Sequence, residues 1–242
     1  MRACNFAQTL VGEPRKGFDL APNDALTQHA DAFNDYPALE RVFFPKTRST
    51  WALWVMRLMG WKLDFEGMPG KFGVAIVYPH TSNWDFPIAM LAKSAIGIKA
   101  RFMAKDSLFK WPVFGAWLTS LGGMAIDRSQ ARGVVGQMVE HFKTCQEKDE
   151  MFWLGVAPEG TRKYQKGWKT GFYQIAHQAQ VPLLLVHFDH GKKVIGVRQC
   201  IRLTGDMAQD FARMAKAYEG VRGFHEKNAS SIEPASRDQG RG

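Results

Sequence analysis

A histidine and an aspartate stand close together after an apolar run, and their residue types are those of an acid–base pair. His80 and Asp85 belong to the polar stretch 80–85, which follows the apolar run 73–79. An apolar run of that length, bounded by Gly and Pro, is typical of a strand buried on both faces. Catalytic groups of open α/β sheets gather beyond the carboxyl ends of such strands. We therefore expect both side chains to face one cleft at that edge of a sheet.

The pair has the composition of a general base. An aspartate that accepts a hydrogen bond from one ring nitrogen fixes the histidine tautomer and leaves the other nitrogen free to take a proton. Such catalysis is typically worth about 10²–10⁴ in rate. The spacing is equally compatible with a purely structural turn, in which His80 and Asp85 cap the start of a helix whose first turn suits Pro87.

A second polar stretch also follows an apolar run, so it too leaves a predicted strand. The run is 151–156, and the polar stretch 157–162 reads Ala-Pro-Glu-Gly-Thr-Arg. His, four residues and Asp, followed about eighty residues later by Pro-Glu-Gly-Thr-Arg, resemble the first and third motifs of the glycerolipid acyltransferase family. Either motif alone is a weak match, but both in this order on two predicted strands make a specific one.

Two further stretches resemble the remaining motifs of that family. Residues 122–128, Gly-Gly-Met-Ala-Ile-Asp-Arg, are similar to the second motif, and the predicted strand 181–186 resembles the fourth. The resemblance covers about 51–201. Pro79 stands where the family often has Asn, and Lys163 where it often has Ser, so the identity of the acceptor stays open.

The resemblance implies transfer of a fatty acyl group from a thioester to the hydroxyl of a lysophospholipid, most simply 1-acylglycerol-3-phosphate. His80 is then the expected base for the hydroxyl proton, and Asp85 the residue that orients it. Because a thioester is already activated, we expect no cofactor and no metal. The expected co-substrate is acyl-CoA or acyl carrier protein, and both donors are compatible with the residues.

The same resemblance implies a set of substrate-binding residues. Arg162 is expected to hold an acceptor phosphate with help from Thr161, since a guanidinium pairs well with phosphate oxygens. Glu159 is expected to anchor Arg162 or to bind acceptor hydroxyls, and backbone N–H groups near Gly160 to bind the developing oxyanion. An internal Glu159–Arg162 ion pair is the structural alternative. The full expected set is Lys105, Arg128, Glu159, Gly160, Thr161 and Arg162.

Other functions fit parts of the same pattern. The chemistry is compatible with another lysolipid acceptor, and a hydrolase would deliver water to the same thioester. A membrane-binding module without catalysis would need only the positive charge and an apolar helix. Arg128 also fits a surface position paired with Asp127. The group His187, Asp189 and His190 suggests a metal site, although we favour a loop or a strand end there.

Strand-like and helix-like patterns alternate from residue 73 to about 218, which predicts an α/β fold. We expect a single domain at 46–225, with a mostly parallel mixed sheet flanked by helices and an N-terminal apolar helix. The polar stretch 1–45 predicts an irregular arm, and the Ser-, Gly- and charge-rich stretch 226–242 a disordered tail. At 242 residues the chain is long enough for a substantial core.

The charge balance and the apolar helix point toward a membrane surface. The formal net charge is +9 and eight Trp are present, three of them in the predicted helix 51–61. A helix of about eleven residues is too short to span a bilayer but suits its interface; packing on the core is the alternative. We expect a peripheral location on the cytoplasmic face, since no signal peptide or spanning segment is visible.

Nucleic-acid-binding patterns are not found, and three Cys without close spacing predict no disulfide framework.

Overall fold

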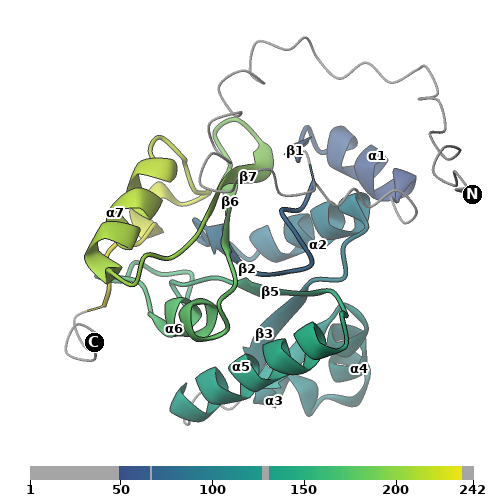
Figure 1. The fold of residues 1–242 in the computed structure, drawn as a ribbon. Coiled ribbons are helices and arrows are strands. Elements are labelled where there is room, and N and C mark those ends of the chain that lie inside the picture. Colours follow the sequence, from purple (N-terminus) through teal and green to yellow (C-terminus); the bar gives the residue numbers. More distant parts are fainter. Residues whose placement is uncertain (1–48, 66, 127–130, 236–242) are drawn as a thin grey trace, which may run out of the picture.

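The structure is a computed structural model that describes residues 49–65, 67–126 and 131–235 (Figure 1). The arm expected at 1–45 therefore lies outside the described residues. The described chain forms one α/β domain around a seven-stranded sheet with the order β1-β7-β6-β2-β5-β3-β4. The strands are β1 (Lys62–Asp64), β2 (Phe72–Tyr78), β3 (Arg101–Lys105), β4 (Gly123–Ile126), β5 (Phe152–Val156), β6 (Leu183–Asp189) and β7 (Val194–Ile201).

The pairing directions put five strand ends on one edge of the sheet. β2 is parallel to both β5 and β6, and β3 is parallel to both β5 and β4. Only β7, antiparallel to β6, and its parallel neighbour β1 run the other way among the described strands. The predicted mostly parallel mixed sheet is thus confirmed, and the carboxyl ends of β6, β2, β5, β3 and β4 meet at a common edge.

Local sequence signals set the ends of several helices. Ser49 caps α1 by accepting from the N–H of Ala52 at 3.4 Å, and Asp206 caps α7 through the N–H of Gln209 at 3.1 Å. Pro112 occupies the first turn of α4, where its missing N–H costs no hydrogen bond. The helices are α1 (Thr50–Leu58), α2 (Asp85–Ile96), α3 (Asp106–Phe109), α4 (Pro112–Ser120), α5 (Ala131–Glu147), α6 (Gly171–Gln178) and α7 (Met207–Ala217).

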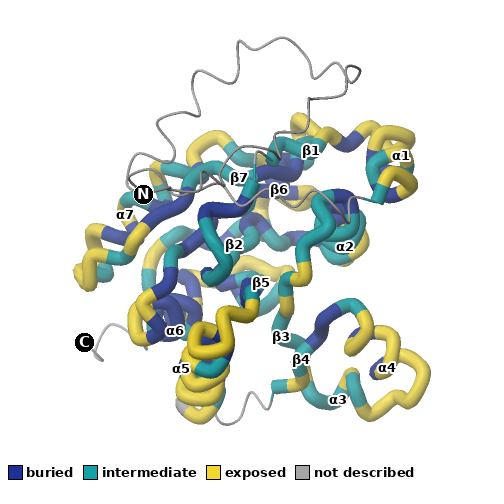
Figure 2. Tube along the Cα trace, turned by 45° about the vertical axis from the view of Figure 1, so that its right-hand side comes forward, coloured by how far each residue is buried: buried dark blue, intermediate teal, exposed yellow. Residues whose placement is uncertain are grey.

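Side chains that alternate along the strands divide the core between the two faces of the sheet. Val74 and Ile76 of β2 pack with α5, α6 and α7 in the largest apolar cluster. The intervening positions Ala75 and Val77 face the other side, where α1 and α2 pack over Phe188 and Ile195. Helices therefore cover both faces of the sheet (Figure 2), as expected for the central strands β2 and β5, which are apolar along their whole length.

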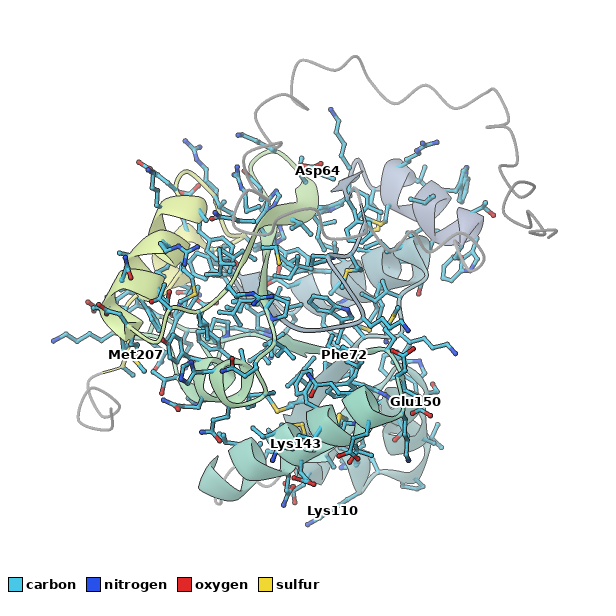
Figure 3. The ribbon with its side chains drawn as sticks, viewed as in Figure 1. Asp64, Phe72, Lys110, Lys143, Glu150 and Met207 are labelled. Carbon is cyan, nitrogen blue, oxygen red and sulfur yellow. The ribbon has the colours of Figure 1, made fainter. Side chains whose placement is uncertain are left out.

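The outer surface of the fold carries charge, while the space between the layers is filled with apolar side chains. In Figure 3 the labelled Phe72, at the start of β2, lies in the middle of the molecule, whereas Lys110, between α3 and α4, lies at its margin. Within the described residues, none of the helices has both the length and the apolar character that crossing a bilayer requires. The longest, α5, has 17 residues.

The prediction of a disordered tail from residue 226 is wrong for residues 226–235. A short 3-10 helix, η3, spans Glu226–Asn228, and Ser230 is 1% exposed. The backbone of Trp168 donates to Glu233 O at 2.7 Å and accepts from the N–H of Ala235 at 2.9 Å. The polar composition of this segment suggested that it makes no contact with the core. Its backbone instead forms hydrogen bonds with the backbone of Trp168. Residues 236–242 are outside the described part.

Candidate active site

Asp85 organises the turn between β2 and α2. Its Oδ2 accepts backbone N–H groups from Thr81 and Ser82, each at 2.9 Å, and its side chain is 1% exposed. The Ser82 hydroxyl accepts the N–H of Trp84 at 3.2 Å. These bonds hold the polar loop closed at the carboxyl end of β2. The structural reading of Asp85 as a residue that caps this turn is therefore correct, and it does not exclude a second role.

The same carboxylate also holds the ring of His80. His80 Nδ1 lies 3.2 Å from Asp85 Oδ2, and the His80 side chain remains 18% exposed. In the part of the chain that the structure describes, no hydrogen-bond partner is recorded for His80 Nε2. A bond to Nδ1 favours the tautomer in which Nε2 carries the lone pair. The arrangement therefore leaves a basic nitrogen on the partly exposed side of the ring.

A second histidine contacts Asp85 from the neighbouring strand. His190, directly after β6, places its Nε2 at 2.7 Å from Asp85 Oδ1, and its side chain is 11% exposed. Burial by itself raises the pKa of the Asp85 carboxyl, but hydrogen bonds from His190, His80 and the Ser82 N–H outweigh it and bring the pKa below its usual range. Asp85 is therefore a buried carboxylate that stays charged at neutral pH.

Glu159 joins the loop after β5 to the loop after β2. Its Oε2 accepts the backbone N–H of His80 at 2.6 Å, and its Oε1 accepts that of Ser230 at 2.9 Å. Desolvation raises the pKa of this buried carboxyl, although both N–H bonds oppose the shift. In the structure both oxygens of Glu159 accept backbone N–H groups, so it positions the backbone of the histidine. Binding of Arg162 or acceptor hydroxyls by Glu159 stays a prediction.

Tyr78 and Ser230 complete the buried floor beneath this loop. The Tyr78 hydroxyl donates to Ser230 O at 3.1 Å, and the Ser230 hydroxyl accepts the N–H of Gln165 at 3.1 Å. Burial, with a smaller contribution from the nearby Glu159 charge, raises the pKa of Tyr78 to about 12. The phenol therefore stays neutral and acts as a donor.

Gly160, Thr161 and Arg162, the last three residues of the Pro-Glu-Gly-Thr-Arg stretch, are less buried than Glu159. Gly160 has a φ of 66°, in the left-handed region that favours glycine, and its N–H already donates to Ala157 O at 3.1 Å. A Cβ at this position would lie 2.9 Å from Lys169 Nζ, so this ammonium lies directly against Gly160. The Thr161 hydroxyl accepts the N–H of Lys163 at 3.4 Å, and Arg162 is exposed.

The other two expected binding residues are more remote or not described. Lys105 is the exposed last residue of β3, and β3 is the strand beyond β5, so it lies on the same edge of the sheet as His80. Arg128 falls in 127–130, outside the described residues. The structure therefore joins His80 to Asp85 and Glu159 by direct contacts. Gly160, Thr161 and Arg162 follow Glu159 in less buried positions, and Lys105 lies two strands from β2 on the same edge of the sheet.

Sequence reasoning missed two residues of this site. The loop or strand end predicted for His187, Asp189 and His190 is what the structure shows, since β6 runs to Asp189 and a turn follows, but His190 also contacts Asp85. The sequence did contain one signal for His190: like His80, it directly follows a predicted buried strand. Ser230 had no such signal, because it lies in a polar stretch distant from every motif. Among the residues described, no cluster of three or more His, Cys, Asp or Glu could hold a metal ion.

The site contains one partly exposed imidazole, that of His80, and the buried Asp85 carboxylate fixes its orientation. Such a group can remove a proton from a hydroxyl or from water. The Arg162 and Lys169 cations lie on the same loop that Glu159 ties to His80. An anionic group on the molecule that carries the hydroxyl would therefore be attracted to this edge of the sheet.

Comparisons with known proteins point to one family. The family model described as acyltransferase matches residues 63–188, which include both polar loops and β6 up to Phe188. The 1-acyl-sn-glycerol-3-phosphate acyltransferase of Escherichia coli (strain K12) is 34% identical over 125 residues, which cover 48% of this chain and 47% of that protein. The chain thus matches less than half the length of this relative.

A solved structure was also found. It is the 1-acyl-sn-glycerophosphate (LPA) acyltransferase from Thermotoga maritima, which is 17% identical and superimposes with a TM-score of 0.44, over 70% of this chain and 73% of the other.

Proposed function

Because the chain belongs to the acyltransferase family, we propose that it transfers a fatty acyl group from a thioester to the hydroxyl of a lysophospholipid, with 1-acylglycerol-3-phosphate as the acceptor. The observation that carries this proposal is the contact of His80 with Asp85 at 3.2 Å on the carboxyl edge of the sheet. The name of the Escherichia coli relative supports the acceptor. The donor is acyl-CoA or acyl carrier protein.

The proposed step needs only side chains of this chain and the two substrates. His80 Nε2 takes the proton of the acceptor hydroxyl while the hydroxyl oxygen attacks the thioester carbonyl carbon. The new C–O bond forms, the C–S bond breaks, and the departing thiolate takes the proton back from His80. Asp85 stabilises the imidazolium between these two events, because its carboxylate remains charged beside the ring. No acyl-enzyme intermediate is required.

Acceptor binding is assigned to the cations of the loop after β5. Arg162 is exposed and Lys169 lies against Gly160, on the loop that Glu159 connects to His80. A guanidinium pairs with phosphate oxygens in a bidentate geometry. We assign Lys105 the same preference for anionic substrates, because β3 ends on the same edge. For Arg128, which lies outside the described residues, only the resemblance of its motif supports the same assignment. A phosphate-bearing acceptor fits these charges better than a neutral one.

An acceptor panel tests the function and the role of Arg162 together. The wild-type protein should acylate 1-acylglycerol-3-phosphate from a radiolabelled thioester faster than an uncharged or amino-lipid acceptor. The Arg162→Ala variant should raise the KM for the phosphate acceptor about tenfold or more, because one charge-assisted contact worth about 1.5–3 kcal/mol is lost. Its kcat, and its KM for the donor, should stay within about threefold.

The matched control is Lys163→Ala, which removes the neighbouring exposed cation and should leave the acceptor KM within about twofold. A change confined to the donor KM would remove Arg162 from the acceptor site. Release of free fatty acid at the same rate without any acceptor would show a hydrolase instead.

We propose a peripheral position on the cytoplasmic membrane surface, with α1 as the contact. Trp51 and Trp54 are 63% and 65% exposed, and Leu58 beside them is 73% exposed, whereas Ala52 and Met56 are buried against the sheet. Tryptophan is favoured at membrane interfaces, and the net charge of +9 suits anionic lipid. Trp111, Val113 and Trp117 of the α4 region are also exposed, and the Trp117 ring contacts Phe86 of α2 at 6.4 Å.

Replacing both exposed tryptophans of α1 tests this position. The double variant Trp51→Ser/Trp54→Ser should bind vesicles that contain anionic lipid more than tenfold more weakly, since each large side chain contributes about 1.5–3 kcal/mol on burial. Its turnover of a short-chain, water-soluble lysophosphatidate should stay unchanged, because neither residue contacts the site. Vesicle co-sedimentation measures the binding. The control Trp51→Phe/Trp54→Phe should retain most of it; equal binding by the Ser variant would exclude α1.

A further inference from the structure

We propose that His190 is a positioning residue that holds Asp85 through the carboxylate oxygen that His80 does not contact. The role of His190 in catalysis rests on the proposed acyl transfer. The effect of His190 on the His80 ring can be measured without that reaction. The proposal goes beyond the His80–Asp85 pair, because it makes the base a set of three side chains from two neighbouring strand ends.

The donors to Asp85 divide unequally between its two oxygens. Oδ2 accepts the N–H groups of Thr81 and Ser82 and faces His80 Nδ1, so it has three neighbours. Oδ1 has His190 Nε2 at 2.7 Å, and within the described residues no other donor to Oδ1 is recorded. Because the carboxylate is buried, the loss of this donor leaves one oxygen of a charged group unsatisfied. The carboxylate would then rotate or draw closer to His80.

His190 is itself held firmly enough to fix its neighbour. Its ring makes edge contacts with Trp61 at 5.0 Å and 90° and with Phe224 at 5.3 Å and 82°, and it stacks on Phe188 at 6.5 Å. Its backbone N–H donates to Arg222 O at 2.8 Å. These contacts come from the residue before β1, from β6 and from the segment after α7. The position of the imidazole is therefore fixed by the tertiary fold.

Two consequences for catalysis follow from this geometry. A carboxylate without its His190 bond is less well oriented, and a displacement of about 1 Å in a catalytic group costs up to about 10²-fold in rate. The same carboxylate shares its charge with fewer donors, so it stabilises the protonated His80 ring more strongly. The ionisable side chains on the elements packed around His190 include Lys62, His187, Asp189, Arg222 and His225, and Glu159 lies beside His80. A substitution at 190 changes none of these residues.

Two substitutions at position 190 separate the hydrogen bond from the packing. His190→Phe keeps a ring between Trp61 and Phe224 but has no donor, whereas His190→Gln keeps an N–H donor at a similar reach. The Phe variant should lose about tenfold to a hundredfold in kcat with the acceptor KM within about twofold. The acid limb of its pH–rate profile should move upward by about half a unit to one unit. The Gln variant should stay near wild type in both.

NMR titration of the His80 ring in the full chain measures the same shift without any substrate. A wild-type His80 midpoint in the Phe variant would overturn the proposal, and so would a Gln variant as impaired as the Phe variant. If the Phe variant does not fold, His190→Leu replaces it with the same expectations. A wild-type protein that acylates no acceptor would end the proposed function, while the NMR result would still decide whether His190 acts on the His80–Asp85 pair.

Discussion

His80→Ala should lower acyl transfer by about 10²–10⁴-fold, the usual contribution of a general base. The loss should appear in kcat and in kcat/KM equally, because the ring acts on the proton only as the hydroxyl attacks. Stability and vesicle binding should stay close to wild type. The His80 backbone N–H, which Glu159 holds at 2.6 Å, is retained by alanine, and the ring is not part of the apolar core.

The matched control is His177→Ala, which removes an exposed histidine at the end of α6 and should leave turnover unchanged. Both variants are compared by single-turnover transfer from a radiolabelled thioester, with thermal unfolding as the check on folding. Turnover of His80→Ala at the wild-type rate would remove this residue as the base. Since the proposed mechanism has no other base, the assignment of the site would be lost with it.

Asp85→Asn should affect both activity and stability. An amide has one acceptor oxygen and one NH₂ group, so it cannot accept donors on both oxygens as the carboxylate does. Transfer should fall by about 10²–10⁴-fold, because the His80 tautomer is no longer fixed and its charge is no longer balanced. The free energy of unfolding at neutral pH should fall by about 1.5–3 kcal/mol, the range for hydrogen bonds to a charged group.

The pH dependence of stability gives an independent measure of the same carboxylate. The pKa of Asp85 in the folded protein lies below its usual range, so the unfolded chain binds this proton first as the pH falls. Its stabilising effect is therefore complete above the ordinary Asp pKa of about 3.9 and decreases as the pH falls below it. Denaturant unfolding from pH 6 down to pH 3 should show a steeper loss in wild type than in Asp85→Asn.

The control for this measurement is Asp149→Asn, which changes an exposed carboxylate that pairs with Lys71. An exposed pair contributes little to stability, so this variant should follow the wild-type pH dependence closely. Parallel curves for wild type and Asp85→Asn would show that Asp85 is not a charge held by its hydrogen bonds in the folded state.

The sequence by itself determined the local elements and the edge on which the chemistry lies. The apolar runs before His80 and Glu159 are β2 and β5, and both residues follow strands that run in the same direction. This was predictable because burial on both faces leaves a continuous apolar signature in a short segment. Each of the two motifs is also a local pattern. Their order along the chain was therefore enough to indicate the family from the sequence.

Only the tertiary structure decided which strands are neighbours, and with them the partners of each site residue. β6 lies next to β2, which brings His190 to Asp85 across 105 positions in the sequence. The segment that holds Ser230 closes on Glu159 across 71 positions, so Glu159 also anchors backbone N–H groups and the start of the expected tail becomes part of the site. No local pattern specifies such pairs, because strand order follows from how the whole chain buries its apolar surface, and a polar residue such as Ser230 contributes no periodic signal to that choice.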